Sequence, residues 1–165
     1  MHNTTRKKVS FLLTFILTLF IFISCTSDTT SAMDDDMEEP VQLRGTIVLE
    51  NNGAQSYTVA SIDGDGISAE TGTANPVITL IVGGRYTFVN QAGASNHPLD
   101  FRNGDREKLF GQSNSSGQLD NDGDVDIVES GDSITFTLTP SLAASIEDYI
   151  CSFHPGMRGD IAVSE

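Results

Sequence analysis

The sequence has no tryptophan, two cysteines and three histidines among its 165 residues. Basic residues are also scarce, since nine Lys and Arg stand against 23 Asp and Glu and leave a formal net charge of −14. So few cations argue against a nucleic-acid-binding protein, because contacts with phosphates depend on Lys and Arg. The negative charge is interpreted first as a source of solubility, and the alternative interpretation is attraction of a basic partner.

The N-terminus combines a basic flank with an apolar segment. Arg6, Lys7 and Lys8 precede an apolar run over residues 9–23. Such a combination is typical of a secretory signal peptide. The alternative is a permanent transmembrane helix, which needs about 20 apolar residues, more than this run provides. We therefore expect residues 1–24 to be a signal peptide and the protein to be exported.

Cys25 follows the apolar run and the small residue Ser24. A cysteine in this place resembles the cleavage site of a bacterial lipoprotein, where it becomes the lipidated N-terminus. Phe22 departs from the usual Leu three positions earlier, and ordinary cleavage with an incidental Cys25 is the alternative. We expect a lipid on Cys25 to anchor the protein to a membrane without spanning it, on the periplasmic side or at the cell surface.

Residues 26–40, TSDTTSAMDDDMEEP, are polar and acidic, with no apolar periodicity. This composition predicts a disordered tether, so residues 25–40 are expected to join the lipid to a folded domain over 41–165. With Cys25 lipidated, Cys151 is a lone thiol in an exported protein, where disulfides are normally permitted. A bound metal would explain why such a thiol is kept.

Short segments with alternating or apolar patterns, separated by turn residues, fill the predicted domain. They are residues 41–49, 56–62, 77–82, 85–90, 98–102, 125–128, 133–139, 148–153 and 160–164. This spacing predicts an all-β sandwich or barrel, with the helical-looking residues 141–148 too short to carry a domain. Gly83-Gly84 is expected to join two strands, and Asp63–Gly66 to form a hairpin turn.

Three potential copper ligands lie within seven residues near the C-terminus: Cys151, His154 and Met157. Each of these residue types, when it occurs alone, more often has a structural role, and a lone Met usually packs in the core. Together with a second imidazole, however, they form the donor set of blue-copper electron-transfer sites. His97 is the remaining candidate, because His2 lies in the predicted signal peptide. Since Cys151 ends a predicted strand, a tight loop can return the other two donors to its sulfur.

Two segments resemble cupredoxins, the family of plastocyanin, amicyanin, pseudoazurin and halocyanin. YICSFHPGMRGDIAV (149–163) is similar to their C-terminal copper loop, with the ligand spacing of the amicyanin type, and VITLIVGGRYTFVNQAGASNHPLDF (77–101) is similar to their first-histidine region. The resemblance implies a Greek-key cupredoxin β-sandwich with one type 1 copper. It implies His97, Cys151 and His154 as ligands, with Met157 as the long axial ligand.

Many cupredoxins have Asn directly after the first histidine, where it ties the two ligand loops together. Here Pro98 follows and Asn96 precedes, so Asn96 or another group is left to serve this role. In cupredoxins the second histidine ligand lies near the surface, so the resemblance implies that electrons would leave through the ring edge of His154. Pro98, Pro155 and Gly156 are expected to frame an apolar docking patch around it.

The expected function is one-electron transfer by a monomer, with a partner such as a cytochrome or a terminal reductase or oxidase. The alternative is copper storage or delivery, which favours open, Met-rich sites, whereas only Met33, Met37 and Met157 lie outside the predicted signal peptide. An enzyme is not expected, because further catalytic coppers need additional histidines. A cysteine nucleophile with a histidine base would leave Met157 without a role.

A second cluster alternates acidic residues over 120–126, a pattern that suggests calcium. An EF-hand loop needs Gly at position 6 and Glu at position 12, where this sequence has Val125 and Gly131. We therefore expect a solvated turn here rather than a calcium site.

Overall fold

The computed structural model describes residues 42–165. The predictions for the signal peptide (1–24), for the lipid on Cys25 and for the tether (25–40) lie outside this range. Among the described residues, no helix is long and apolar enough to cross a membrane.

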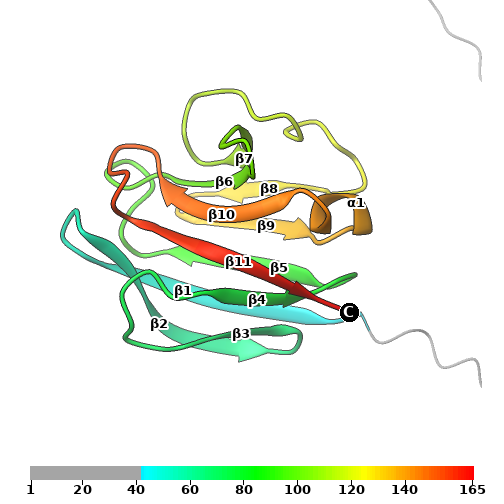
Figure 1. The fold of residues 1–165 in the computed structure, drawn as a ribbon, viewed down its shortest axis with the longest axis horizontal. Helices are drawn as coiled ribbons and strands as arrows, with labels where there is room; N and C mark the ends of the chain where they lie inside the picture. The colour runs from blue at the N-terminus through cyan, green and yellow to red at the C-terminus, as the bar shows by residue number, and fades with distance from the viewer. Residues whose placement is uncertain (1–41) are drawn as a thin grey trace, which may run out of the picture. The chain divides into compact units, whose positions relative to one another are not determined.

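Two mixed β-sheets pack together, which confirms the predicted all-β sandwich (Figure 1). The first has the strand order β2-β1-β5-β9-β8 and comprises β1 (Arg44–Asn52), β2 (Ser56–Gly64), β5 (Arg85–Asn90), β8 (Val128–Ser130) and β9 (Ser133–Thr137). The second has the order β3-β4-β11-β10-β6-β7 and comprises β3 (Ile67–Ala69), β4 (Ile78–Ile81), β6 (Leu99–Asn103), β7 (Lys108–Gly111), β10 (Ile146–Cys151) and β11 (Arg158–Ser164). Helix α1 (Pro140–Ala143) forms one turn before β10.

The core between the sheets is built from alternating side chains. In β5 and β9 every second residue is buried, as the alternation in their sequences predicts. Aromatic rings join the two sheets: Phe88 lies edge-on to Phe101 with ring centroids 5.0 Å apart, and Phe101 lies 5.2 Å from Phe136. Each such fully buried side chain contributes about 1.5–3 kcal/mol, which makes the sandwich a firm base for the loops at its ends.

Two glycine-rich connections cross between the sheets. The prediction of a hairpin turn at residues 63–66 is wrong, because β2 and β3 belong to different sheets. The positive φ angles of Gly64 and Gly66, +89° and +75°, let the chain change direction there at little conformational cost. Gly83-Gly84 does join two strands, as predicted, but β4 and β5 also lie in different sheets.

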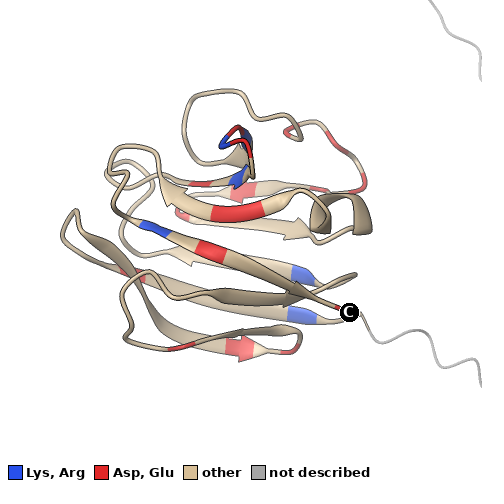
Figure 2. Ribbon diagram, in the orientation of Figure 1, with Lys and Arg blue, Asp and Glu red and all other residues tan. Residues whose placement is uncertain are grey.

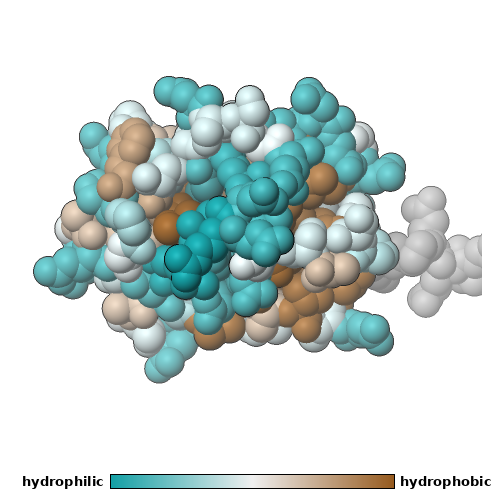
Figure 3. All heavy atoms as spheres, turned by 45° about the horizontal axis from the view of Figure 1, so that its top comes forward, coloured by the Kyte–Doolittle hydropathy of each residue, from teal (hydrophilic) through white to brown (hydrophobic). Residues whose placement is uncertain are grey.

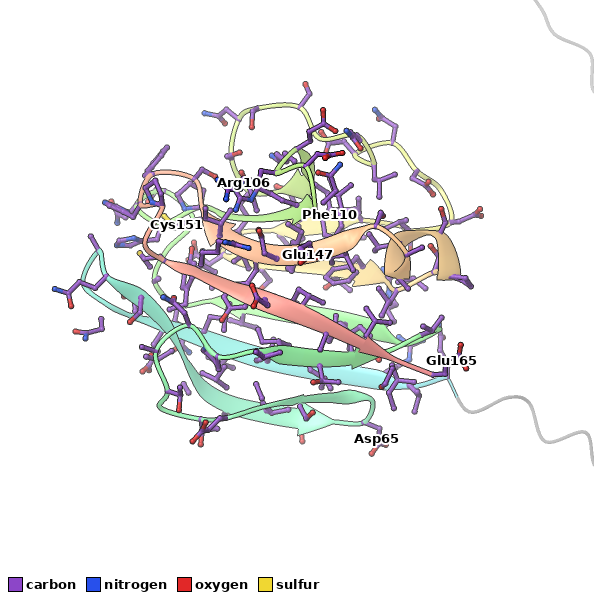
Figure 4. All side chains as sticks on the ribbon, in the orientation of Figure 1. Asp65, Arg106, Phe110, Glu147, Cys151 and Glu165 are labelled. Atoms are coloured by element: carbon purple, nitrogen blue, oxygen red, sulfur yellow. The ribbon has the colours of Figure 1, made fainter. Side chains whose placement is uncertain are left out.

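The loops after β5 and after β10 lie at the same end of the sandwich. β10 ends at Cys151 and β11 begins at Arg158, so residues 152–157 form one loop, while residues 91–98 connect β5 to β6. Because β1 runs parallel to β5 and β11 starts from the 152–157 loop, the strand ends at Arg44 and Ser164 lie at the opposite end. Figure 4 shows Cys151 and Glu165 at these two ends.

Candidate metal centre

Cys151 is the last residue of β10 and is fully buried. The loop that follows is tied by backbone hydrogen bonds: the N–H of Met157 donates to His154 at 2.9 Å, and the N–H of Cys151 donates to Met157 at 2.9 Å. The N–H of Ser152 donates to the carbonyl oxygen of Pro98 at 3.1 Å, which joins this loop to the one that carries His97. The predicted tight return over Cys151 is therefore present.

His97 lies in the 91–98 loop, with its backbone held on both sides. Its N–H donates to the carbonyl oxygen of Gly93 at 2.8 Å. Its own carbonyl oxygen accepts from the hydroxyl of Tyr57 and from the side-chain amide of Asn90, each at 2.7 Å. Both donors are fully buried core residues, so the sandwich itself positions this histidine.

The thiol and the two imidazoles form one cluster. The Sγ of Cys151 lies 3.4 Å from Nδ1 of His154 and 3.8 Å from Nδ1 of His97. The imidazole rings are tilted by 38°, with centroids 4.7 Å apart. Metal bonds of about 2.0–2.3 Å place the three ligand atoms of a trigonal site roughly 3.5–4 Å apart, so these separations fit a shared ion.

Within residues 42–165, this is the one group of three or more His, Cys, Asp or Glu side chains arranged to hold a metal ion. The structure thus brings together His97, Cys151 and His154, as the sequence predicted. Met157 is fully buried in the core at the end of the same loop. Its role as a fourth ligand stays a prediction.

Burial changes the acid–base behaviour of this region. The pKa of His97 is lowered, first by burial and then by the neighbouring His154, which favours the neutral ring that a metal requires. Burial also raises the pKa of Tyr57 far above its ordinary value, and the nearby Cys151 adds to this effect. The Tyr57 hydroxyl therefore remains a hydrogen-bond donor to His97.

The outer nitrogen of His97 has its own neighbour, which sequence reasoning missed. Nε2 lies 3.4 Å from the side-chain amide nitrogen of Asn51, near the end of β1. The same amide nitrogen donates to the carbonyl oxygen of Gly53 at 2.8 Å, which fixes the orientation of the Asn51 side chain beside the His97 ring.

Other residues than Asn96 tie the ligand loops to the fold. Asn96 is exposed, and within the described part of the chain its side chain makes no hydrogen bond to the 152–157 loop. Asn75 instead accepts from the N–H of Tyr57 at 3.0 Å and donates to the carbonyl oxygen of Gly156 at 2.9 Å. Its positive φ of 49° is a conformation that asparagine tolerates better than most residues, but no local pattern marked it for this role.

The surface beside the cluster differs from the predicted patch. Pro98 is buried, whereas Pro155 and Gly156 are exposed. Phe153 has 62% of its surface exposed, the most of any large apolar side chain described. It borders a cavity of about 530 Å³ that Pro98 and Ser152 also line. The 91–98 and 152–157 loops contain no charged residue.

The surrounding surface is polar and acidic. Figure 2 shows Asp and Glu on both sheets and in several loops, with few Lys and Arg. Figure 3 shows hydrophilic side chains over most of the face that it presents, with smaller apolar areas between them. The acidic segment over 120–126 forms turns, as predicted, in which Asp122 accepts from the N–H groups of Asp124 and Val125.

No model of a known protein family matches this chain, and no curated protein or solved structure matches it either.

Proposed function

We propose that this protein is a cupredoxin-like electron carrier that binds one type 1 copper ion through His97, Cys151 and His154, with Met157 as the axial ligand. One observation carries the proposal: the Nδ1 atoms of both imidazoles are directed at one buried thiol, at 3.4 and 3.8 Å. The bound copper would supply one-electron chemistry between Cu(I) and Cu(II).

The donor set favours copper over zinc. Zinc in structural sites takes four strong ligands in a tetrahedron, usually with several thiolates. Here one thiol and two imidazoles converge, and the next donor along the same loop is the weak thioether of Met157. Two imidazoles and a thiolate with a distant thioether are the ligands of blue-copper sites.

The frame around the ligands supports electron transfer over storage or delivery. Tyr57 and Asn90 hold the backbone of His97, while the hydrogen-bonded turn between Cys151 and Met157 holds the other donors. Ligands fixed in this way keep nearly one geometry in both oxidation states, which lowers the barrier to electron transfer. Storage and delivery require ligands that open and exchange, and the buried Cys151 is poorly placed for that.

The half-buried His154 and the exposed Phe153 offer a place for a redox partner to approach. The two loops that carry the ligands are uncharged, so a partner can come close there without burying unpaired charges. The acidic remainder of the surface would attract a partner with basic residues, such as a cytochrome or a terminal reductase or oxidase.

We further propose that the carrier is exported and held to a membrane by a lipid on Cys25, on the periplasmic side or at the cell surface, as the N-terminal sequence predicts. A lipid on Cys25 would be attached through the segment that enters β1 at Arg44, at the end away from the ligands. The nine residues of β1 extend about 30 Å. The proposed ligands thus lie at the end of the sandwich opposite the first residue of β1.

The test is a visible absorption and electron paramagnetic resonance spectrum of the copper-loaded protein. Both sheets and their core lie within residues 42–165, so a chain that begins at residue 26 retains them and has Cys151 as its sole cysteine. An intense visible band is expected, and Cys151→Ser should abolish it. A Cys151→Ser protein that keeps the band would refute the assignment, and slow electron self-exchange in a tightly bound copper protein would favour storage or delivery.

A further inference from the structure

A buried ion pair lies close to the candidate metal centre without belonging to its proposed ligands. Asp100, in β6, is 5% exposed, and its Oδ1 lies 3.5 Å from the Nζ of Lys108, in β7. The side chain of Lys108 is 10% exposed. Two charges buried in this way are unfavourable unless hydrogen bonds satisfy both, so their other partners are informative.

The segment after β7 wraps around both charges. Nζ of Lys108 donates to the carbonyl oxygens of Gly111 at 3.0 Å, Ser113 at 2.8 Å and Ser115 at 2.7 Å. The carboxylate of Asp100 accepts from the N–H of Ser113 at 3.0 Å and from its hydroxyl at 2.6 Å. The pair is therefore fully engaged with residues 111–115, which hold it in one arrangement.

Gly111 makes this close approach possible. Its φ is +144°, and a Cβ at this position would collide with the backbone and the carboxylate of Asp100. Any larger residue would push β7 away from β6 and open the ion pair. Glycine is thus required at this position by the close approach of the Asp100 carboxylate and not by a turn.

The remaining bond of Asp100 leads to the candidate metal centre. Its Oδ2 accepts a short hydrogen bond from the hydroxyl of Ser152, the residue directly after Cys151. The N–H of Ser152 donates to Pro98, and Cys151 pairs with Leu99 across the two strands. Ser152 is therefore held at two points by residues that closely follow His97, Pro98 in the loop and Asp100 in β6.

We propose that Asp100, neutralised by Lys108, is a positioning residue for Cys151. By holding the Ser152 hydroxyl, it sets the direction in which the chain leaves β10, and so keeps the Cys151 thiol buried and aimed at the two imidazoles. Asp100 does not touch the ligand atoms. The functional meaning of this role rests on the proposed copper site, but the positioning itself is testable without metal.

The test measures how fast a small aromatic disulfide reagent modifies Cys151 in the metal-free chain that begins at residue 26, under native conditions. Reaction with a buried thiol requires the loop to open. Ser152→Ala removes one hydrogen bond to a charged acceptor, so the reaction should be about tenfold faster or more. Ser152→Thr keeps a hydroxyl and should restore the slow reaction.

Thr139→Ala is the matched control. It also removes one hydroxyl hydrogen bond, the one that Thr139 accepts from the N–H of Leu142 at 3.1 Å, at the opposite end of the sandwich. This variant should react at the wild-type rate. The proposal is overturned if Ser152→Ala reacts no faster than wild type, or if Thr139→Ala is accelerated equally.

Copper loading separates this proposal from the proposed function. In the loaded protein, Ser152→Ala should shift the visible absorption band, whereas Thr139→Ala should not. If the wild-type chain binds no copper, the proposed function fails, while the labelling rates of the two variants still decide whether Asp100 and Ser152 position Cys151.

Discussion

The hydroxyl of Tyr57 donates a 2.7 Å hydrogen bond to the backbone carbonyl oxygen of His97. Tyr57 belongs to β2 and is fully buried, whereas His97 lies in the loop between β5 and β6. A core residue of the first sheet thus holds the backbone of a candidate ligand. The stability of the sandwich and the geometry of the metal centre are therefore coupled.

Tyr57→Phe should lower both stability and copper affinity. The substitution removes one buried hydrogen bond and should reduce the free energy of unfolding by about 1 kcal/mol, measured by urea denaturation. Tyr149→Phe is the control, because the hydroxyl of Tyr149 also donates at 2.7 Å, but to Pro76. It should lose similar stability with unchanged copper affinity, and an equal loss of affinity in both variants would contradict the coupling.

Alkaline pH should destabilise the protein through its tyrosines. Burial raises the pKa of Tyr57, Tyr86 and Tyr149 above the ordinary value of 10. Above pH 10 the unfolded chain loses these protons while the folded protein keeps them, so stability is complete below pH 10 and falls as the pH rises further. Each tyrosine that stays protonated in the folded protein but ionises in the unfolded chain lowers the free energy of unfolding by about 1.4 kcal/mol per pH unit.

Urea denaturation between pH 9 and 11.5 measures this slope. Tyr149→Phe should make it shallower by about 1.4 kcal/mol per pH unit, because phenylalanine does not titrate. A variant with the full wild-type slope would show that Tyr149 ionises equally well in the folded protein.

Mild acid should destabilise the metal-free protein through His97. Its folded-state pKa lies below the ordinary value of 6.5, because burial and the nearby His154 disfavour the charged ring. As the pH falls, the unfolded chain therefore binds a proton before the folded protein does. The contribution of His97 to the free energy of unfolding is complete above pH 6.5 and is lost as the pH falls toward the folded-state pKa. Unfolding measured from pH 7.5 to 5.5 should show a weaker pH dependence in His97→Asn, and an unchanged dependence would exclude this role.

Asp148 should be the most sensitive ionic residue of the second sheet. It is 1% exposed, and it accepts from the guanidinium groups of Arg102 and Arg158, each at 2.8 Å, so that β6, β10 and β11 are joined. Asp148→Ala leaves both cations without this partner and should cost about 3–5 kcal/mol of stability. Asp160 forms an exposed pair with Arg158, and Asp160→Ala should cost about 1 kcal/mol or less. Similar losses in denaturant titrations of the two variants would argue against this difference.

Met157→Leu separates packing from ligation. Both side chains have similar volume, so the buried position should accept leucine at a cost below about 1.5 kcal/mol. If the sulfur is the axial ligand, the copper-loaded variant should show a shifted visible spectrum and a changed reduction potential. A spectrum and a potential equal to those of the wild type would assign Met157 to packing alone.

The local part of this structure could be predicted from the sequence. Alternation of apolar and polar residues marks the strands because neighbouring side chains of a strand point to opposite faces. β3 and β7 escaped prediction, and the strand predicted over 125–128 overlaps β8 only at Val128, because these strands are short and have little alternation of their own. The close spacing of Cys151, His154 and Met157 also identified one loop of the candidate centre, since residues so near in sequence cannot lie far apart.

The rest of the structure depends on contacts between segments that lie far apart in the sequence. Pairing between strands determines that β2 and β3, like β4 and β5, lie in different sheets, although a turn of the same composition also suits a hairpin. The hold of Tyr57 and Asn90 on His97, and of Asp100 on Ser152, depends on strand register across the whole sandwich. The sequence by itself therefore determined most of the strands and the candidate ligands, because both follow from local pattern and donor chemistry. Only the tertiary structure decided what holds those ligands, because that depends on which distant side chains the packing of the two sheets brings together.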